Sequence, residues 1–280
     1  MENKSKKISL IPKIIHLFWF GKEEKSNVIK KCIQSWKKFA PDYKIMEWIE
    51  DNFDVTFCER SKQAYLQKRW AFVADIARLK VIYDIGGVYL DTDVELLQPL
   101  DDLLQETDYA KTFFCFHNER FIGTGYGFGS VAKAPVIGYL LNNYVKMNFD
   151  IKRGIFNKVC THIETEALEE YYEGNFKRND QNQVMIDGTI MLSTGVWNRY
   201  SVHYGTGTWV DGGREKNIII KHQNFIRIKE KIRKPEYFLW VRKHLGRKAE
   251  YIYEFVTYDL FDMGFMYFFK RFIKKIKKKL

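Results

Sequence analysis

The first fifty residues alternate between strand-like and helix-like hydrophobic patterns, and this order limits the fold more than any other feature of the chain. Residues 11–21, IPKIIHLFWFG, form a short apolar run that is rich in β-forming residues and ends at a glycine. Residues 26–39 carry apolar side chains at helical spacing behind Ser26, which can cap a helix, and residues 43–50 form a second strand-like run. This order predicts a βαβ unit, which is typical of nucleotide-binding α/β folds. No G-x-G-x-x-G phosphate loop follows the first strand, so an ordinary dinucleotide-binding domain is not supported.

Further patterns continue the alternation of helices and strands as far as residue 146. They predict a helix over 61–84, a strand over 88–97, a strand over 109–117, a glycine-rich loop over 121–130 and a helix over 133–146. Gly86 and Gly87 are expected to end the long helix. Residues 150–200 are polar with mixed helical signals, and the sequence supports no assignment there.

The predicted strand over 88–97 contains two acids, Asp91 and Asp93, in an otherwise apolar run. An unpaired buried charge costs several kcal/mol, so acids in a core strand need partners. Alternation places Tyr89, Asp91 and Asp93 on one side of the strand. Two carboxylates that project together suit a hard divalent cation, and a diphosphate can complete its shell. Alone the motif is weak, because about one D-x-D arises by chance in a chain this acidic, and a solvated turn is the alternative.

The surroundings of these acids resemble the D-x-D region of family 32 glycosyltransferases. The likeness is carried by AFVADIARLKVIYDIGGVYLDTDVELLQPLDDLL, by the opening IPKIIHLFWFG, and by the stretches SWKKFAPDYKIMEWIEDNFDV, FIGTGYGFGS and SVHYGTGTW. It covers most of residues 8–210. The family includes bacterial capsule and polysaccharide enzymes and yeast mannosyltransferases, and it is distantly similar to clostridial toxin glucosyltransferase domains. The resemblance implies a GT-A fold (a Rossmann-like mixed sheet flanked by helices), a nucleotide-sugar donor, Mn2+ or Mg2+, and usually retention of anomeric configuration.

The resemblance also implies a role for individual residues. Asp93 would bind the metal directly, and Asp91 would contact the sugar and ribose of the donor and bind the metal through water. Asp75 and Arg78 would hold the transferring sugar. His203 would close the metal site. The full expectation is catalysis by Asp75, Arg78 and Asp91, metal binding by Asp91, Asp93 and His203, and donor binding by Trp19, Asp75, Arg78, Tyr89, Asp91, Gly123, Thr124, Gly125 and Trp209.

Each of these roles has a simpler alternative in the sequence. Asp75 and Arg78 are three residues apart and could form a surface salt bridge on a helix. Trp19 and Tyr89 could belong to the core, His203 could be structural, and the glycines of the loop over 121–130 could serve an ordinary turn.

No nucleophile is evident in the sequence. The nearest candidates are Asp187 and Glu166, and both are weak. His16 lies in an apolar strand and is expected to be structural. The four cysteines show no C-x-x-C spacing, which favours reduced, buried thiols over a metal site or disulfides.

Basic charge is concentrated at the end of the chain. Residues 216–280 contain 18 Lys or Arg against 6 Asp or Glu, whereas residues 1–215 contain 28 against 29. We therefore expect a catalytic domain over 1–215 and a helical extension over 216–280. Phenylalanines and lysines at helical spacing in the extension are typical of an amphipathic helix at an anionic membrane surface. The N-terminus lacks the features of a signal peptide, so we expect a cytoplasmic protein at the inner face of the cell membrane.

The sequence therefore predicts a metal-dependent glycosyltransferase. It would move a sugar from a nucleotide donor, with UDP favoured over GDP, to a glycan or lipid-linked oligosaccharide in bacterial surface polysaccharide synthesis. Two alternatives stay open, a metal-dependent nucleotidyltransferase or nuclease and a non-catalytic glycan-binding protein. A neutral body without a basic groove argues against a nucleic-acid partner.

Overall fold

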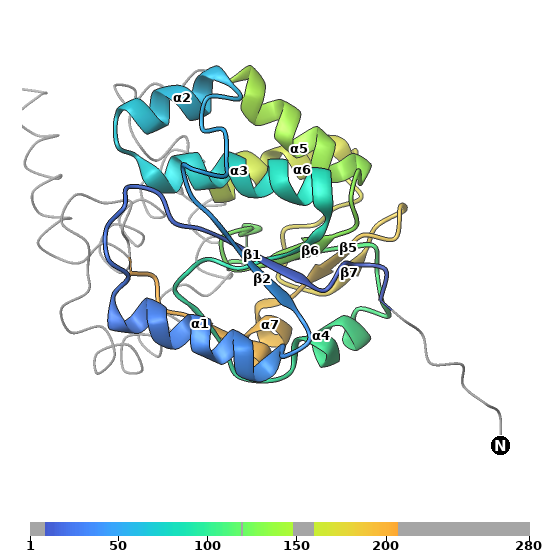
Figure 1. The fold of residues 1–280 in the computed structure, drawn as a ribbon. Helices are drawn as coiled ribbons and strands as arrows, with labels where there is room; N and C mark the ends of the chain where they lie inside the picture. The colour runs from blue at the N-terminus through green and yellow to red at the C-terminus, as the bar shows by residue number, and fades with distance from the viewer. Residues whose placement is uncertain (1–8, 119, 148–159, 207–280) are drawn as a thin grey trace, which may run out of the picture. The chain divides into compact units, whose positions relative to one another are not determined.

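A seven-stranded mixed sheet lies between two layers of helices (Figure 1). The computed structural model describes residues 9–118, 120–147 and 160–206. The strand order is β2-β1-β3-β6-β5-β8-β7, with parallel and antiparallel neighbours, and a second sheet contains β4 and β9. Helices α2, α3, α5 and α6 cover one face, and α1, α4 and α7 cover the other. The expected mixed α/β sheet flanked by helices is confirmed, and the arrangement fits a GT-A-like fold.

The predicted βαβ unit forms the start of this sheet. Strand β1 (Ile14–Phe18) pairs in parallel with β2 (Lys44–Trp48), and α1 (Asn27–Phe39) connects them. The Ser26 side chain accepts a hydrogen bond from the Ile29 backbone N–H and caps α1, as expected.

The long helix predicted over 61–84 is wrong in one respect, because the structure divides it into α2 (Glu59–Leu66) and α3 (Trp70–Ile85). Lys68 between them has a φ of 54°, a left-handed conformation that stops an α-helix. Hydrophobic spacing continues across this break, so periodicity alone cannot show it. Gly86 caps the end of α3 as predicted.

The single strand predicted over 88–97 is also wrong. It consists of β3 (Gly87–Tyr89) in the large sheet and β4 (Val94–Leu96) in the small one, and the D-x-D lies in the connection. The Val94 backbone N–H donates to the Asp91 carbonyl at 3.0 Å, which closes a turn around both acids. Strand β4 pairs with β9 (Ser201–His203), a partner that alternation within residues 88–97 cannot reveal.

The remaining elements complete the two helix layers and the far half of the sheet. They are α4 (Leu100–Glu106), β5 (Thr112–Cys115), β6 (Phe128–Ser130), α5 (Pro135–Lys146), α6 (Cys160–Tyr171), β7 (Gln183–Val184), β8 (Ile190–Leu192) and α7 (Thr194–Tyr200). The glycine-rich loop is shorter than predicted, because its last three residues form β6 between β3 and β5.

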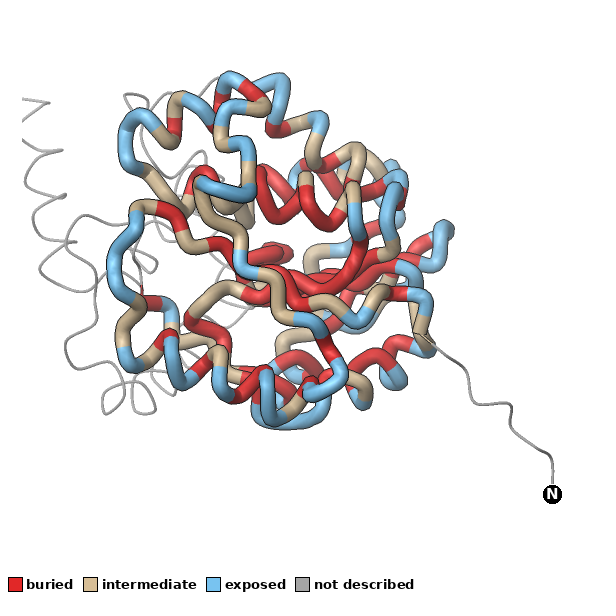
Figure 2. The backbone as a smooth tube through the Cα atoms, viewed as in Figure 1, coloured by how far each residue is buried: buried red, intermediate tan, exposed pale blue. Residues whose placement is uncertain are grey.

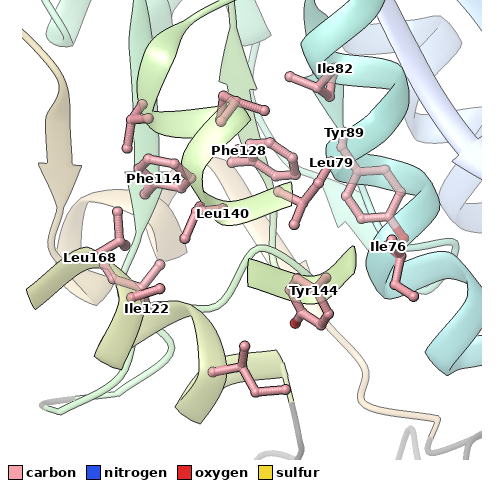
Figure 3. Close-up of a cluster of buried hydrophobic side chains, with 14 of the residues drawn as sticks. Ile76, Leu79, Ile82, Tyr89, Phe114, Ile122, Phe128, Leu140, Tyr144 and Leu168 are labelled. Carbon is pink, nitrogen blue, oxygen red and sulfur yellow. The ribbon is translucent and has the colours of Figure 1, made fainter. Parts of the chain in front are cut away.

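Buried side chains form one cluster on each face of the sheet. Figure 2 shows the strands buried and the outer helix surfaces exposed. The cluster in Figure 3 packs Leu79 of α3 and Leu140 of α5 against Tyr89, Phe114 and Phe128 of the strands. The other cluster contains Val88 and Leu90, so alternation holds up to the end of β3. Both helix layers are thereby anchored to the strands that carry the D-x-D.

Two further expectations can be compared with the described residues. The four cysteines are free, with Cys32, Cys58 and Cys115 buried and Cys160 half-buried. No described helix has the length and apolar character needed to cross a membrane. The predicted boundary at residue 215 and the amphipathic helix lie outside the described residues and stay predictions.

Candidate functional site

The turn after β3 brings three candidate metal ligands together. Val94 faces His203 across the β4–β9 pair, so the imidazole reaches the preceding residue, Asp93. His203 Nε2 lies 3.0 Å from Asp93 Oδ1 and 3.9 Å from Asp91 Oδ2. One ligand atom from each of the three residues lies within 4.8 Å of the others. The structure therefore groups the same three residues that the sequence predicted as metal ligands.

The backbone of this turn is held by hydrogen bonds from α1 and from the residue that follows β9. The indole of Trp36 in α1 donates to the Val94 carbonyl at 2.7 Å, and the Ser35 hydroxyl accepts from the Leu96 N–H at 2.8 Å. The Tyr204 N–H donates to the Asp93 carbonyl at 3.0 Å. The position of the two acids is thus set by α1 and by the end of β9.

Asp91 lies against the glycine-rich loop. Its N–H donates to the Gly125 carbonyl at 3.3 Å, and a Cβ at Gly125 would lie 2.8 Å from Asp91 Oδ2. Any side chain at position 125 would therefore displace this carboxylate from its observed position. The Tyr89 hydroxyl donates to Asp91, so Tyr89 is buried core and a partner of the acid at once. Burial raises the pKa of Asp91 to about 6, with Asp93 adding to the rise and Arg78 opposing it.

Arg78 is a buried cation beside the two acids, and its side chain is 2% exposed. Its Nη2 lies 2.8 Å from Asp75 Oδ1, and its Nη1 lies 3.7 Å from Asp91 Oδ1. The guanidinium also lies over the Tyr89 ring, 5.4 Å from its centroid. The alternative of a surface salt bridge is therefore wrong. Instead, the Asp75–Arg78 pair is buried next to Asp91, the first acid of the D-x-D.

Glu164 of α6 completes this cluster, and the sequence interpretation missed it. Its carboxylate is fully buried and lies 3.2 Å from Arg78 Nη2. The Thr124 hydroxyl donates to it at 2.7 Å. The available signal was an acid beside the apolar positions Ala167 and Leu168 of one helical stripe.

The two residues proposed as nucleophiles do not join the cluster. Glu166 is exposed on α6, and Asp187 is exposed in the turn after β7, where it accepts hydrogen bonds from Tyr172 and the Thr189 N–H. Among the described residues, the structure brings neither of them to the D-x-D.

Trp19 lies where β1 ends, at the carboxyl ends of the parallel strands β1 and β3. His16 pairs with Tyr89 in the parallel β1–β3 ladder, so Trp19 and Asp91 both follow the carboxyl ends of neighbouring strands. Its ring is half-buried, its indole N–H donates to the Glu23 carbonyl at 2.6 Å, and Lys25 Nζ lies 5.2 Å from the ring centroid. This placement differs from plain core. Trp209 lies outside the described residues, and Gly123 lies in the same loop as Gly125.

His16 is structural, as predicted. It is fully buried, its Nε2 donates to the Gly86 carbonyl at 2.9 Å, and its Nδ1 accepts from the Trp48 indole at 3.0 Å. Burial lowers its pKa to about 4, although the bond to Gly86 opposes the change, so the imidazole is neutral at pH 7.

The three grouped residues fit a hard or borderline divalent cation. Two carboxylates and one imidazole can fill some of the coordination positions of Mn2+ or Mg2+. Phosphate oxygens of a donor could fill the remaining positions. A cation at this point would also offset the charge of two acids held side by side. Arg78, Asp75 and Glu164 are not among the grouped ligands; Arg78 approaches Asp91 Oδ1, whereas His203 approaches Oδ2.

Comparisons with known proteins point to the same region. Residues 26–110 match the family described as "Glycosyltransferase sugar-binding region containing DXD motif". This stretch contains Asp75, Arg78 and both acids, but neither Glu164 nor His203.

The curated relatives and a solved structure bear similar descriptions. The chain is 26% identical over 175 residues to an uncharacterized glycosyltransferase of Acanthamoeba polyphaga mimivirus, covering 59% of this chain and 68% of that protein. It is 26% identical over 148 residues to inositol phosphoceramide mannosyltransferase 1 of Schizosaccharomyces pombe, covering 49% of this chain and 44% of that protein. The PaToxG glycosyltransferase structure aligns with 59% of this chain and 71% of its own, at a TM-score of 0.46 and 19% identity.

Proposed function

We propose that this chain, a glycosyltransferase with a D-x-D sugar-binding region, transfers a sugar from a nucleotide-diphosphate donor by means of a divalent cation held at Asp91, Asp93 and His203. The observation that carries the proposal is the grouping of these three ligands, two in the turn between β3 and β4 and one on β9. Two of them belong to the matched stretch, and β9 supplies the third.

When bound, the cation would offset the negative charge of the diphosphate and stabilise it as a leaving group. The protein residues would act around it. Arg78, desolvated and paired with Asp75, adds fixed positive charge beside Asp91 where the donor is expected. Asp75 and Asp91 can accept hydrogen bonds from sugar hydroxyls and orient the ring. Trp19 offers a half-buried indole for the nucleotide base at the same sheet edge.

The acceptor is proposed to be carried on a lipid. Two observations support this, the basic and aromatic composition of residues 216–280 and the names of the yeast relatives, which are inositol phosphoceramide mannosyltransferases. A role in bacterial surface polysaccharide synthesis, retention of configuration, the UDP preference and attachment to the inner face of the membrane stay predictions from the sequence. The matches reported above name glycosyltransferases, and they favour this function over a nuclease or a non-catalytic glycan-binding protein.

Donor hydrolysis by the full-length protein tests the proposal. The protein would be incubated with UDP- and GDP-sugars in Mn2+, in Mg2+ or in EDTA, with and without lipid-linked acceptors, and released nucleoside diphosphate would be measured. We expect release from one donor that stops in EDTA and returns when the cation is restored. Release that is equal with and without EDTA would refute the cation-dependent mechanism. No release from any donor, together with no binding of Mn2+ and UDP or GDP by calorimetry, would refute the function.

A further inference from the structure

Glu164 is a fully buried carboxylate that three segments of the chain approach. Arg78 of α3 lies 3.2 Å away, the Tyr144 hydroxyl of α5 donates at 3.2 Å, and the Thr124 hydroxyl donates at 2.7 Å, all to Oε1. The Thr124 N–H donates to Oε2 at 3.3 Å. One side chain thereby joins two helices to the loop that contains Gly125.

Neutralising Arg78 does not by itself explain this acid. Asp75 already lies 2.8 Å from the same Nη2, so Glu164 adds a second negative charge to a nitrogen that is already paired. A buried carboxylate is unfavourable unless hydrogen bonds and charges offset its desolvation, and an apolar residue in this place is often as stable. We therefore expect the Glu164 carboxylate to have a role other than stabilising the fold.

The geometry around Arg78 indicates that role. Two carboxylates hold Nη2, which leaves Nη1 directed toward Asp91 Oδ1 at 3.7 Å. On its other side Glu164 holds Thr124, whose neighbour Gly125 accepts the hydrogen bond from the Asp91 N–H. Glu164 thus contacts both groups that flank Asp91, while Asp91, Asp93 and His203 are grouped without it.

We propose that Glu164 is a positioning residue for the donor site: it orients the Arg78 guanidinium and the Thr124–Gly125 backbone around Asp91. The inference rests on the proposed function. Glu164 acts through Arg78 and Thr124 and does not touch the donor. Its loss should therefore slow transfer while leaving the cation site in place.

The test compares Glu164→Gln with Glu166→Gln in the full-length protein. Both substitutions remove one negative charge from α6, but Glu166 is exposed and lies outside the cluster. We expect Glu164→Gln to lower kcat for donor turnover about 10- to 100-fold, as loss of outer-shell partners commonly does, with the Mn2+ concentration for half-maximal rate unchanged. Glu166→Gln should match the wild type. Rates are compared well below the melting temperatures, which circular dichroism would give for each protein.

A milder variant covers the case in which Glu164→Gln does not fold. Tyr144→Phe removes one hydrogen bond to Glu164 Oε1 but keeps the ring and the carboxylate, and we expect a smaller fall in kcat in the same direction. An unchanged kcat in whichever variant folds would overturn the inference. Parallel losses of kcat and Mn2+ affinity would also overturn it, because they indicate general loosening. A wild type without cation-dependent release refutes the proposed function and this assignment with it.

Discussion

Gly125→Ala is the most incisive perturbation of this site, because it adds one methyl group directly against Asp91. The new Cβ would lie 2.8 Å from Asp91 Oδ2 and 3.5 Å from Arg78 Nη1. Ordinary van der Waals contact begins at 3.4 Å, so the carboxylate would have to retreat by about 0.6 Å. Gly125 does not need the left-handed backbone that favours glycine, so strain of the main chain does not enter.

The displacement should affect activity far more than stability. The atom that must move is the end of a flexible side chain that is 32% exposed, so we expect a change in free energy of unfolding of about 1 kcal/mol or less. A misplacement of about 1 Å at reacting groups can cost about 100-fold in rate, so a shift near half that size should lower kcat by about 10-fold or more.

Release of nucleoside diphosphate in Mn2+ would measure the rate, and urea denaturation would measure stability. Gly195→Ala is a matched control, because its Cβ would meet only the Ser193 hydroxyl at 3.9 Å within the helix α7. It should keep wild-type activity. Full activity in Gly125→Ala would refute the argument that the Asp91 carboxylate must occupy its observed position.

Three further substitutions test other parts of the structure. Asp93→Asn should abolish cation-dependent release without loss of fold, whereas the exposed Asp51→Asn should change neither; residual EDTA-sensitive turnover in Asp93→Asn would contradict the ligand assignment. Arg78→Met should lower the free energy of unfolding by about 3–5 kcal/mol in urea denaturation, because it leaves buried acids unpaired, and a loss below about 1 kcal/mol would argue against a buried ion cluster. The pKa of His16 falls from 6.5 to about 4 on folding. Between pH 6.5 and about pH 4 the unfolded chain therefore binds a proton on His16 that the folded chain does not bind. The free energy of unfolding decreases as the pH falls through this window. His16→Gln should reduce that decrease by about 3 kcal/mol, and an unchanged pH profile of the denaturation midpoint would exclude His16 as its source.

The initial βαβ unit, several elements up to residue 146 and most of the charged site could be predicted from the sequence. The βαβ unit follows from hydrophobic spacing in residues 11–50, because a few residues are enough to distinguish the helical spacing of apolar residues from a strand-like apolar run. Asp91 and Asp93 stand out because acids are rare in apolar runs. Asp75 and Arg78 are neighbours on a helix by spacing alone. These are local properties, and a local pattern is sufficient to show them.

The tertiary structure decided the features that depend on partners far away in the chain. The predicted strand over 88–97 divides because β4 pairs with β9, and the same pairing places His203 beside Asp93. Arg78 belongs to a buried ion cluster and not to a surface pair with Asp75, because α6 brings Glu164 to it. Glycine at position 125 matters because its loop returns against Asp91. Hydrophobic periodicity reports which side of an element is buried, whereas the neighbour that covers it is set by how the layers pack.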